Sequence, residues 1–421
     1  MIAPLRRLHL QSLAVIAPAL VISITGLLTV YATESKGDIA HTDRQLIFIA
    51  LSLAAVVAMN LVSYQRIGRW AFLLFVAGMI LLIPMILAKF LPLDSFIPRR
   101  GGARRWIQFP GFQLQPSELM KIAYILALAW YLRFRRNYRT LRGLVGPFTL
   151  TLLPMALILL QPDLGTVLLF MPMLFFMLFA AGARMKHFFI LMVLAALSVP
   201  GFWTIMPDYQ KRRVVAVLLQ NDDIRNAIVE SQNPNRWAWL CSRQDAARWK
   251  IRDGYQLICS KAALGSGGLA GQPWRQGTYV KYDILPDKHN DFIFAVIGHQ
   301  FGFIGCVVVL ACFGIIVLIA FDIAATTNDP FGRLVAVGAA TLLATQVLIN
   351  VSVTVGLMPI TGMTLPFASC GGSSLLTSYL LIGLLINVAQ RKPILLAKKP
   401  FTFDKDAPNA DPRATGLAGV G

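Results

Sequence analysis

The sequence predicts an all-α polytopic membrane protein of about ten transmembrane helices, with a large extracytoplasmic loop between the seventh and the eighth. Hydrophobic residues fill 56% of the 421 positions and only 14% are charged. The mean hydropathy is +0.63. These values lie outside the range of soluble domains. Apolar runs long enough to cross a hydrocarbon layer of roughly 30 Å recur throughout the chain.

The predicted spans follow one another closely. We expect them at residues 12–31, 45–62, 70–90, 118–134, 144–160, 165–182, 187–206, 291–320, 334–356 and 374–389. The first run is too long, and too tightly followed by the second, to be a cleaved signal peptide. Pro116 opens the fourth span at the first helical turn, and Pro162 with Gly165 breaks the chain after the fifth. Residues 1–399 therefore form one domain, and the Asp-, Pro-, Ala- and Gly-rich residues 400–421 are expected to be a disordered cytoplasmic tail.

Basic residues in the short loops predict the orientation. Arg66 and Arg69 follow the second span, five arginines follow the fourth, and Arg184 with Lys186 follow the sixth. Lysine and arginine accumulate on the cytoplasmic side, so both termini should be cytoplasmic. These loops account for much of the formal charge of +19. Their simplest partners are anionic membrane lipids, and we expect no nucleic acid partner.

Two loops that should face outward are basic as well. The loop 207–290 ends with Lys288, but long loops are translocated regardless of their charge. The shorter loop 91–117 carries Arg104 and Arg105. Guanidinium groups offer paired donors that suit phosphate oxygens. We expect an anionic, phosphate-bearing ligand at the outer surface, with lipid head groups as the alternative.

Asp291 stands directly before an apolar run, in the segment LPDKHNDFIF. A carboxylate at the mouth of a membrane helix is costly to desolvate. It has two interpretations: an ordinary helix cap that accepts a backbone hydrogen bond, or a catalytic group. The sequence alone favours the cap, and the other polar motifs shift the balance towards the catalytic group.

Further polar residues lie near the ends of other spans. Trp106, among arginines, suits a membrane interface. Glu118 and Lys121 lie at i and i+3 on one helix, close enough to pair, and pairing makes their burial tolerable. Asp163 either caps the sixth span or presents a carboxylate on the outer side. Each is a candidate site residue as well as a candidate structural one.

The stretch MPITGMTLPFASCGGSS, residues 358–374, is polar and glycine-rich at the outer end of the last span. Unwound backbone at that depth must line protein or a water-filled cavity. Its last two residues, Ser373 and Ser374, are therefore candidates for substrate binding or for support of a site.

Taken together, the motifs resemble those of one family. GARRWI, QPSELMK, QPDLGT, ALGSGGL, LPDKHNDFIFAVIG and TLPFASCGGSS occur in this order, as in the SEDS family of RodA and FtsW polymerases. The resemblance covers about residues 10–390, and QPDLGT and PITGMTLPF lean towards the RodA branch. It implies a bacterial cytoplasmic-membrane peptidoglycan glycosyltransferase that polymerises lipid II, beside a class B penicillin-binding protein transpeptidase, in cell-wall elongation and cell-shape maintenance. The family's essential aspartate falls on Asp291, and its other motif residues fall on Trp106, Glu118, Lys121 and Asp163.

The chain departs from the family pattern at several positions. Asn290 replaces a threonine, Cys370 replaces a tyrosine, and His299 with Gln300 replaces an acidic pair. Residues 220–253 look like an insertion. The loss of the acidic pair puts a metal or proton role at that position in doubt.

The glycosyl transfer that this resemblance implies suits the residues. A positioned carboxylate can take the proton of an acceptor hydroxyl as general base, and we assign this role to Asp291, with inversion at the donor anomeric carbon. Arg104, Arg105 and Lys288 would stabilise the departing pyrophosphate. Glu118 and Lys121 would hold the site without reacting.

No cofactor is certain from the sequence. A divalent cation, Mg or Mn, would screen the pyrophosphate, and Asp291 and Asp287 are the only nearby oxygen ligands. The five cysteines form no metal pattern. Cys241 and Cys259 share the outward loop, where a disulfide is permitted.

Three other functions fit parts of the pattern. A flippase for a lipid-linked precursor would use intramembrane charges and broken helices, but it should show midplane ionisable groups and an internal repeat. A noncatalytic scaffold would leave the outer polar residues unexplained. An FtsW-like division paralogue would share the chemistry but not the elongation role.

Overall fold

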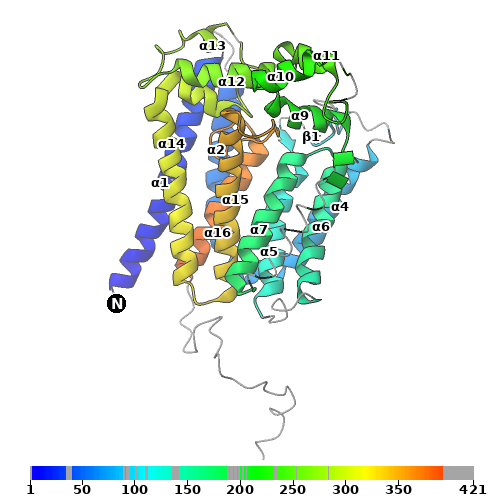
Figure 1. The fold of residues 1–421 in the computed structure, drawn as a ribbon. Helices are drawn as coiled ribbons and strands as arrows, with labels where there is room; N and C mark the ends of the chain where they lie inside the picture. Colours follow the sequence, from blue (N-terminus) through cyan, green and yellow to red (C-terminus); the bar gives the residue numbers. More distant parts are fainter. Residues whose placement is uncertain are drawn as a thin grey trace, which may run out of the picture.

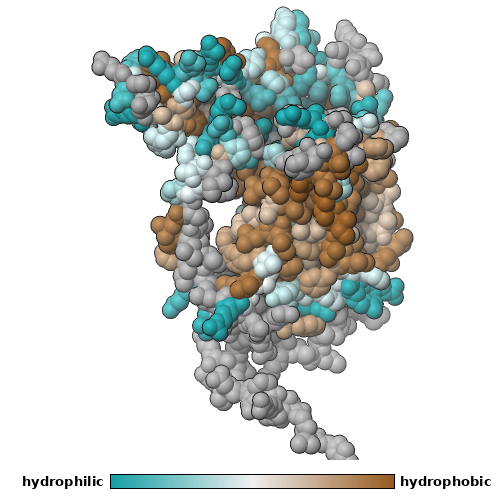
Figure 2. All heavy atoms as spheres, turned by 90° about the vertical axis from the view of Figure 1, so that its right-hand side faces the viewer, coloured by the Kyte–Doolittle hydropathy of each residue, from teal (hydrophilic) through white to brown (hydrophobic). Residues whose placement is uncertain are grey.

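The computed structural model describes residues 2–34, 40–88, 95–99, 103–109, 112–134, 142–184, 206–231, 236–252, 254–282 and 284–391, with scattered positions between them. Long helices stand side by side and roughly parallel, and a layer of short helices covers one end (Figure 1). The chain begins at the opposite end. An apolar belt surrounds the middle of the face shown in Figure 2, and polar side chains gather above and below it.

The long helices match the predicted spans. They are α1 (Ile2–Thr33), α2 (Ala40–Leu61), α4 (Ala71–Leu87), α5 (Pro116–Leu132), α6 (Val145–Leu160), α7 (Leu164–Ala181), α14 (Ile293–Thr326), α15 (Pro330–Thr354) and α16 (Gly372–Gln390). Among the described residues, seven helices are long and apolar enough to cross a membrane, and α4 is a shorter apolar helix. The predicted span 187–206 lies mostly outside the described residues. The polytopic helical fold is confirmed.

The centre of the bundle is formed by α5, α15 and α16. In the most apolar 18-residue stretch of each helix, 78% of α15 and 83% of α16 is buried inside the protein, against 17% of α2. A helix that is apolar on all faces belongs in an interior or in lipid, and these two helices are covered by their neighbours. The short helix α3 (Tyr64–Arg69) links α2 to α4.

The helix α14 extends beyond the predicted span and contains a kink. Gly302 has φ 67° and ψ −164° in the middle of its 34 residues. A Cβ at Gly302 would lie 2.4 Å from the backbone nitrogen of Gly271. Only glycine allows this approach and this φ. The loop that precedes α14 replaces a lost helical bond, since the Phe303 N–H donates to the Gly268 carbonyl at 2.9 Å.

The large loop predicted between the seventh and eighth spans is folded. It contains α9 (Asp208–Leu218), α10 (Asp222–Val229), α11 (Arg243–Arg248), α12 (Tyr255–Ser266) and α13 (Thr278–Lys281). The region predicted as an insertion packs on α9 through its own apolar cluster, which includes Val215, Ile228 and Trp249. The Trp249 indole donates to the Ala216 carbonyl at 3.0 Å.

A small β-ribbon accompanies the helices of the all-α fold. Strands β1 (Ile107–Phe109) and β2 (Phe112–Leu114) pair antiparallel in the loop before α5, with Gln108 opposite Gln113. The Phe109 and Phe112 rings stack with centroids 4.8 Å apart. The ribbon pairs backbone groups that would otherwise need other partners at the membrane surface.

Candidate active site

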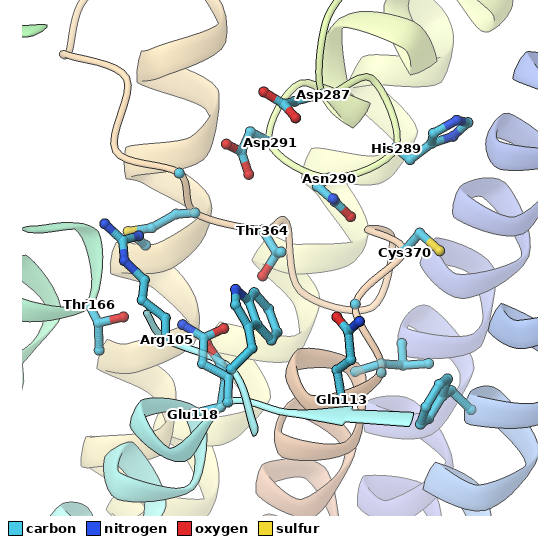
Figure 3. Close-up of a pocket in the computed structure, with 18 of the residues that line it drawn as sticks. Arg105, Gln113, Glu118, Thr166, Asp287, His289, Asn290, Asp291, Thr364 and Cys370 are labelled. Atoms are coloured by element: carbon cyan, nitrogen blue, oxygen red, sulfur yellow. The ribbon is translucent and has the colours of Figure 1, made fainter. Parts of the chain in front are cut away.

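A cavity of about 710 Å³ opens between the ribbon, the starts of α2 and α5, and the loops that precede α14 and α16. The strand β1, which contributes to its lining, lies at the end of the bundle that carries the short helices (Figure 1), and Figure 3 shows lining side chains. Five of the predicted site residues line it: Arg105, Trp106, Glu118, Lys121 and Asp291. Segments far apart in the sequence therefore meet at one pocket.

Asp291 is not a helix cap. The N-cap of α14 is Phe292, and no side chain caps it. The carboxylate of Asp291 faces the cavity beside Asp287 (Figure 3). The Asn350 amide fixes the backbone by donating to the Asp291 carbonyl at 3.0 Å. The cap interpretation is wrong because the helix begins at Ile293, with Phe292 and not Asp291 at its N-cap.

Burial, and after it the neighbouring Asp287 carboxylate, raise the pKa of Asp291 to about 7. The cations Arg213 and Arg105 oppose that rise, and Asp163 adds weakly to it. A carboxyl group with a pKa near neutrality can accept and release protons at physiological pH, which is what a general base requires.

Asp163 does cap α7, and it also holds Arg105. Its carboxylate accepts hydrogen bonds from the Thr166 N–H at 3.3 Å and the Thr166 hydroxyl at 2.9 Å. It pairs with the Arg105 guanidinium at 3.5 Å. Arg105 also donates to the carbonyls of Gln161 and Pro162. The buried carboxylate thus acts as an anchor that sets the direction of a cation in the cavity.

Gly362 leaves space between this cation and Asp291. A Cβ at Gly362 would lie 3.6 Å from an Asp291 carboxylate oxygen and 3.8 Å from an Arg105 guanidinium nitrogen. Its φ of 73° also favours glycine. A side chain at this position would occupy the room that a ligand needs between the carboxylate and the guanidinium.

Glu118 and Lys121 form the expected ion pair, at 2.8 Å. Lys121 reaches the Gln346 side-chain oxygen at 3.4 Å, and the Gln346 amide donates to the Thr364 carbonyl at 3.0 Å. The Thr364 hydroxyl lies 2.7 Å from that of Ser374. The pair therefore ties α5 to α15 and to the unwound segment before α16.

Five predicted residues, Asp163 among them, are not part of the cavity lining. Arg104 donates to the Ile97 carbonyl at 3.1 Å, and Lys288 is buried and donates to the Thr33 carbonyl at 3.0 Å. Neither lines the pocket, and the contact of these two cations with a pyrophosphate stays a prediction. Ser373 is buried behind the lining, and Ser374 contributes through Thr364.

The structure adds residues that the sequence did not single out. Arg213, on α9, lines the cavity and donates to the Ile360 carbonyl at 3.1 Å. His41 and Arg44 enter from the start of α2, and His289 and Cys370 from the two loops. Nothing in the local pattern separates Arg213 from the other basic residues of its loop. Only the packing of α9 against the segment before α16 does so.

The divalent cation stays a prediction, whereas the structure contains no Cys241–Cys259 disulfide. No group of three or more histidine, cysteine, aspartate or glutamate residues within the described part of the chain could hold a metal ion. Asp287 and Asp291 are two carboxylates in the cavity. His299 and Gln300 lie away from it, in hydrogen bonds to Ser266 and Arg275. All five cysteines, Cys241 and Cys259 included, are free thiols.

Comparisons with known proteins agree with this architecture. The FtsW, RodA and SpoVE family, described as cell cycle proteins, matches residues 6–393. The chain is similar to the probable peptidoglycan glycosyltransferase FtsW of Geobacter metallireducens, with 33% identity over 92% of this chain and 96% of the relative. It is 30% identical to the peptidoglycan glycosyltransferase MrdB of Escherichia coli K12, over 86% of this chain and 89% of that protein.

Solved structures match over most of the bundle. A chain of a peptidoglycan synthase complex, solved for the coordination of polymerization and crosslinking, has a TM-score of 0.70 and 27% identity over 90% of this chain and 97% of its own. The rod shape determining protein RodA of Thermus thermophilus has a TM-score of 0.62 and 25% identity over the same shares. The profile match and the relatives together mean that this chain belongs to the FtsW/RodA/SpoVE family, the SEDS membrane proteins.

Proposed function

We propose that this protein is a peptidoglycan glycosyltransferase that polymerises lipid II on the outer face of the bacterial cytoplasmic membrane. One observation carries the proposal. Asp291, a carboxylate that caps no helix and has a pKa near neutrality, shares an open cavity with Arg105 and Arg213. The relatives named peptidoglycan glycosyltransferases support it. The basic short loops support cytoplasmic termini and a cavity that faces outward.

In this reaction Asp291 takes the proton of the acceptor 4-hydroxyl. The acceptor oxygen attacks the donor anomeric carbon, with inversion, and the bond to the lipid pyrophosphate breaks. Arg105 and Arg213 stabilise the negative charge that develops on the leaving pyrophosphate. Asp163 keeps Arg105 in position through the 3.5 Å ion pair.

A divalent cation fits the two carboxylates at the site. Mg²⁺ is commonly held by one or two carboxylates together with substrate phosphates, and Asp287 and Asp291 both line the cavity. When bound, the cation would supply positive charge next to the pyrophosphate. Mn²⁺ would fit the same oxygen ligands.

The direct test is polymerisation of labelled lipid II by the purified protein in detergent, with and without a class B penicillin-binding protein. We expect glycan strands longer than the starting disaccharide. Movement of lipid II across proteoliposome bilayers without strand formation would instead support the flippase. Strands that form only with the partner, and equally with an Asp291→Asn variant, would support a scaffold.

The pH profile of this reaction should report the charges around Asp291. Activity should rise with pH through about 7, because the base works only when deprotonated. Asp287→Asn removes a charge that raises the pKa of Asp291, so the rising limb should move to lower pH. Arg213→Gln removes a charge that lowers it, so the limb should move to higher pH. The check is the rate between pH 5 and 9 at a fixed Mg²⁺ concentration. Shifts in the same direction would contradict this electrostatic account.

The cellular role that we propose is elongation and maintenance of cell shape, beside a class B penicillin-binding protein. The motifs QPDLGT and PITGMTLPF support it. Relatives named FtsW and MrdB match at similar identities. The role is therefore tested by depleting the protein in cells. Depletion should give round cells if the role is elongation, whereas filaments would assign the protein to division.

A further inference from the structure

The cavity has two basic ends. Arg105 lies on the same side as Asp287 and Asp291, whereas His289 and Cys370 lie on the other side (Figure 3). Arg213 acts on Asp291 and so belongs to the first end. His41 and Arg44, which also line the cavity, complete the second end. The mechanism above uses only the first.

The second end is built and rigid. The His41 and His289 rings stack with centroids 4.9 Å apart and planes 20° from parallel. The Nδ1 atom of His289 lies 3.0 Å from the Thr33 hydroxyl. The Cys370 N–H donates to the His289 carbonyl at 2.9 Å. Two elements distant in sequence therefore hold these two imidazoles in a fixed stack.

The second end carries a guanidinium. Among the described residues, no ion pair includes Arg44. A carboxylate also acts at this end: Glu34 accepts from the His41 N–H at 2.7 Å and the Thr42 N–H at 3.2 Å. Burial and the Glu34 carboxylate raise the pKa of the Cys370 thiol to about 11, and Arg44 opposes this rise. The thiol is therefore uncharged at pH 7.

The start of α16 adds hydrogen-bond donors at the same place. Its N-cap is Gly371, and no side chain caps it. Gly371 and Gly372 line the cavity. Free N–H groups at a helix start favour an anion.

Close packing brings this helix start to Arg44. A Cβ at Gly372 would lie 2.4 Å from the Phe48 ring on α2. Phe48 is one turn beyond Arg44 on the same helix, and both line the cavity. The glycine therefore allows α2 and α16 to meet at the cavity wall, so the guanidinium and the uncapped helix start face one space.

The chemistry of chain growth needs two anion sites at different distances from the base. The donor pyrophosphate is bonded to the carbon under attack, so it must lie next to Asp291. The acceptor pyrophosphate lies at the other end of its disaccharide from the attacking hydroxyl. It must therefore be bound away from Asp291, in the same cavity or at its rim.

We propose that Arg44, His41, His289 and the start of α16 form the subsite for the acceptor's pyrophosphate, while Arg105 and Arg213 bind the donor's. This assignment rests on the proposed glycosyl transfer. The new bond joins the acceptor 4-oxygen to the donor anomeric carbon. The donor pyrophosphate leaves with the electron pair of the broken bond, and the proton passes to Asp291. The acceptor's pyrophosphate stays intact and only binds the acceptor to the protein.

The test separates the two substrates. Lipid II with galactose on its 4-hydroxyl can act only as donor and is kept saturating. Two acceptors are compared: lipid II, and the same disaccharide pentapeptide with an anomeric methyl group in place of the lipid pyrophosphate. The full-length protein is used with its partner, and the galactose-capped tetrasaccharide product is measured by mass.

Arg44→Gln should raise the KM for lipid II as acceptor about tenfold, the loss of one charge-assisted contact. Its KM for the methyl glycoside should not change. Arg44→Lys should recover part of the affinity, because it keeps the charge but not the paired donors. Lys281→Gln removes an exposed outward charge that does not line the cavity, and it should leave both values unchanged. If the methyl glycoside couples too slowly, its inhibition of lipid II coupling provides the same comparison.

An equal rise in KM for both acceptors, or no rise for either, would overturn the subsite assignment and leave glycosyl transfer intact. Failure of the parental protein to couple any acceptor would remove the proposed function itself. A raised requirement for the galactose-capped donor in Arg44→Gln would place the donor pyrophosphate at this end and reverse the assignment.

Discussion

Replacement of Asp291 by asparagine should reduce lipid II polymerisation by roughly 10²- to 10⁴-fold, the usual contribution of a general base. Asparagine has nearly the same shape and keeps the backbone contact with Asn350. It cannot accept the hydroxyl proton. The rate should be measured with purified protein at pH 8, where the parental carboxyl is ionised.

The matched control is Asp208→Asn, an exposed aspartate at the start of α9 that does not line the cavity. It should polymerise lipid II at the parental rate. Both variants should unfold at the parental temperature in detergent. An Asp291→Asn protein that is folded and fully active would exclude this residue as the base, and glycosyl transfer would then need another proton acceptor in the cavity.

Breaking the Glu118–Lys121 pair should have the largest effect on stability. The two side chains are 2.8 Å apart and almost fully buried. Lys121→Met leaves Glu118 as an uncompensated buried charge, which typically costs about 3–5 kcal/mol. The measurement is thermal unfolding in detergent, with exposed Lys281→Met as the control.

Restoring neutrality should restore stability. The double variant Glu118→Gln with Lys121→Met should unfold at a higher temperature than Lys121→Met alone, because no unpaired charge remains. The charge-swapped double variant, Glu118→Lys with Lys121→Glu, should also recover more polymerisation activity than either single swap. If neither double variant improves on its singles, the two residues act independently and the pairing has no energetic role.

Local patterns in the sequence were sufficient for the spans and for several site residues. Hydropathy over a window of bilayer length depends only on neighbours in the chain, so α2, α7 and α15 lie where the pattern places them. The Glu118–Lys121 pair follows from helical periodicity alone. The cap at Asp163 follows from the break that precedes α7.

Local patterns were not sufficient where the path of a loop sets the direction of a side chain. Arg104 and Arg105 are adjacent, yet one satisfies the Ile97 carbonyl and the other enters the cavity beside Asp163. Lys288 and Asp291 also belong to one short motif, and only Asp291 faces the cavity. A turn sends neighbouring side chains to different sides, so composition and spacing do not reveal which one faces a ligand.

The sequence by itself determined a polytopic helical bundle with polar motifs at its predicted outer end, because burial in lipid demands long apolar helices whatever their neighbours. Only the tertiary structure decided which cations share a cavity with Asp291. Arg213 reaches it through the packing of α9 on residue Ile360, and Arg44 through the close contact of α2 with Gly372. These contacts join residues more than a hundred positions apart, and no local pattern encodes them.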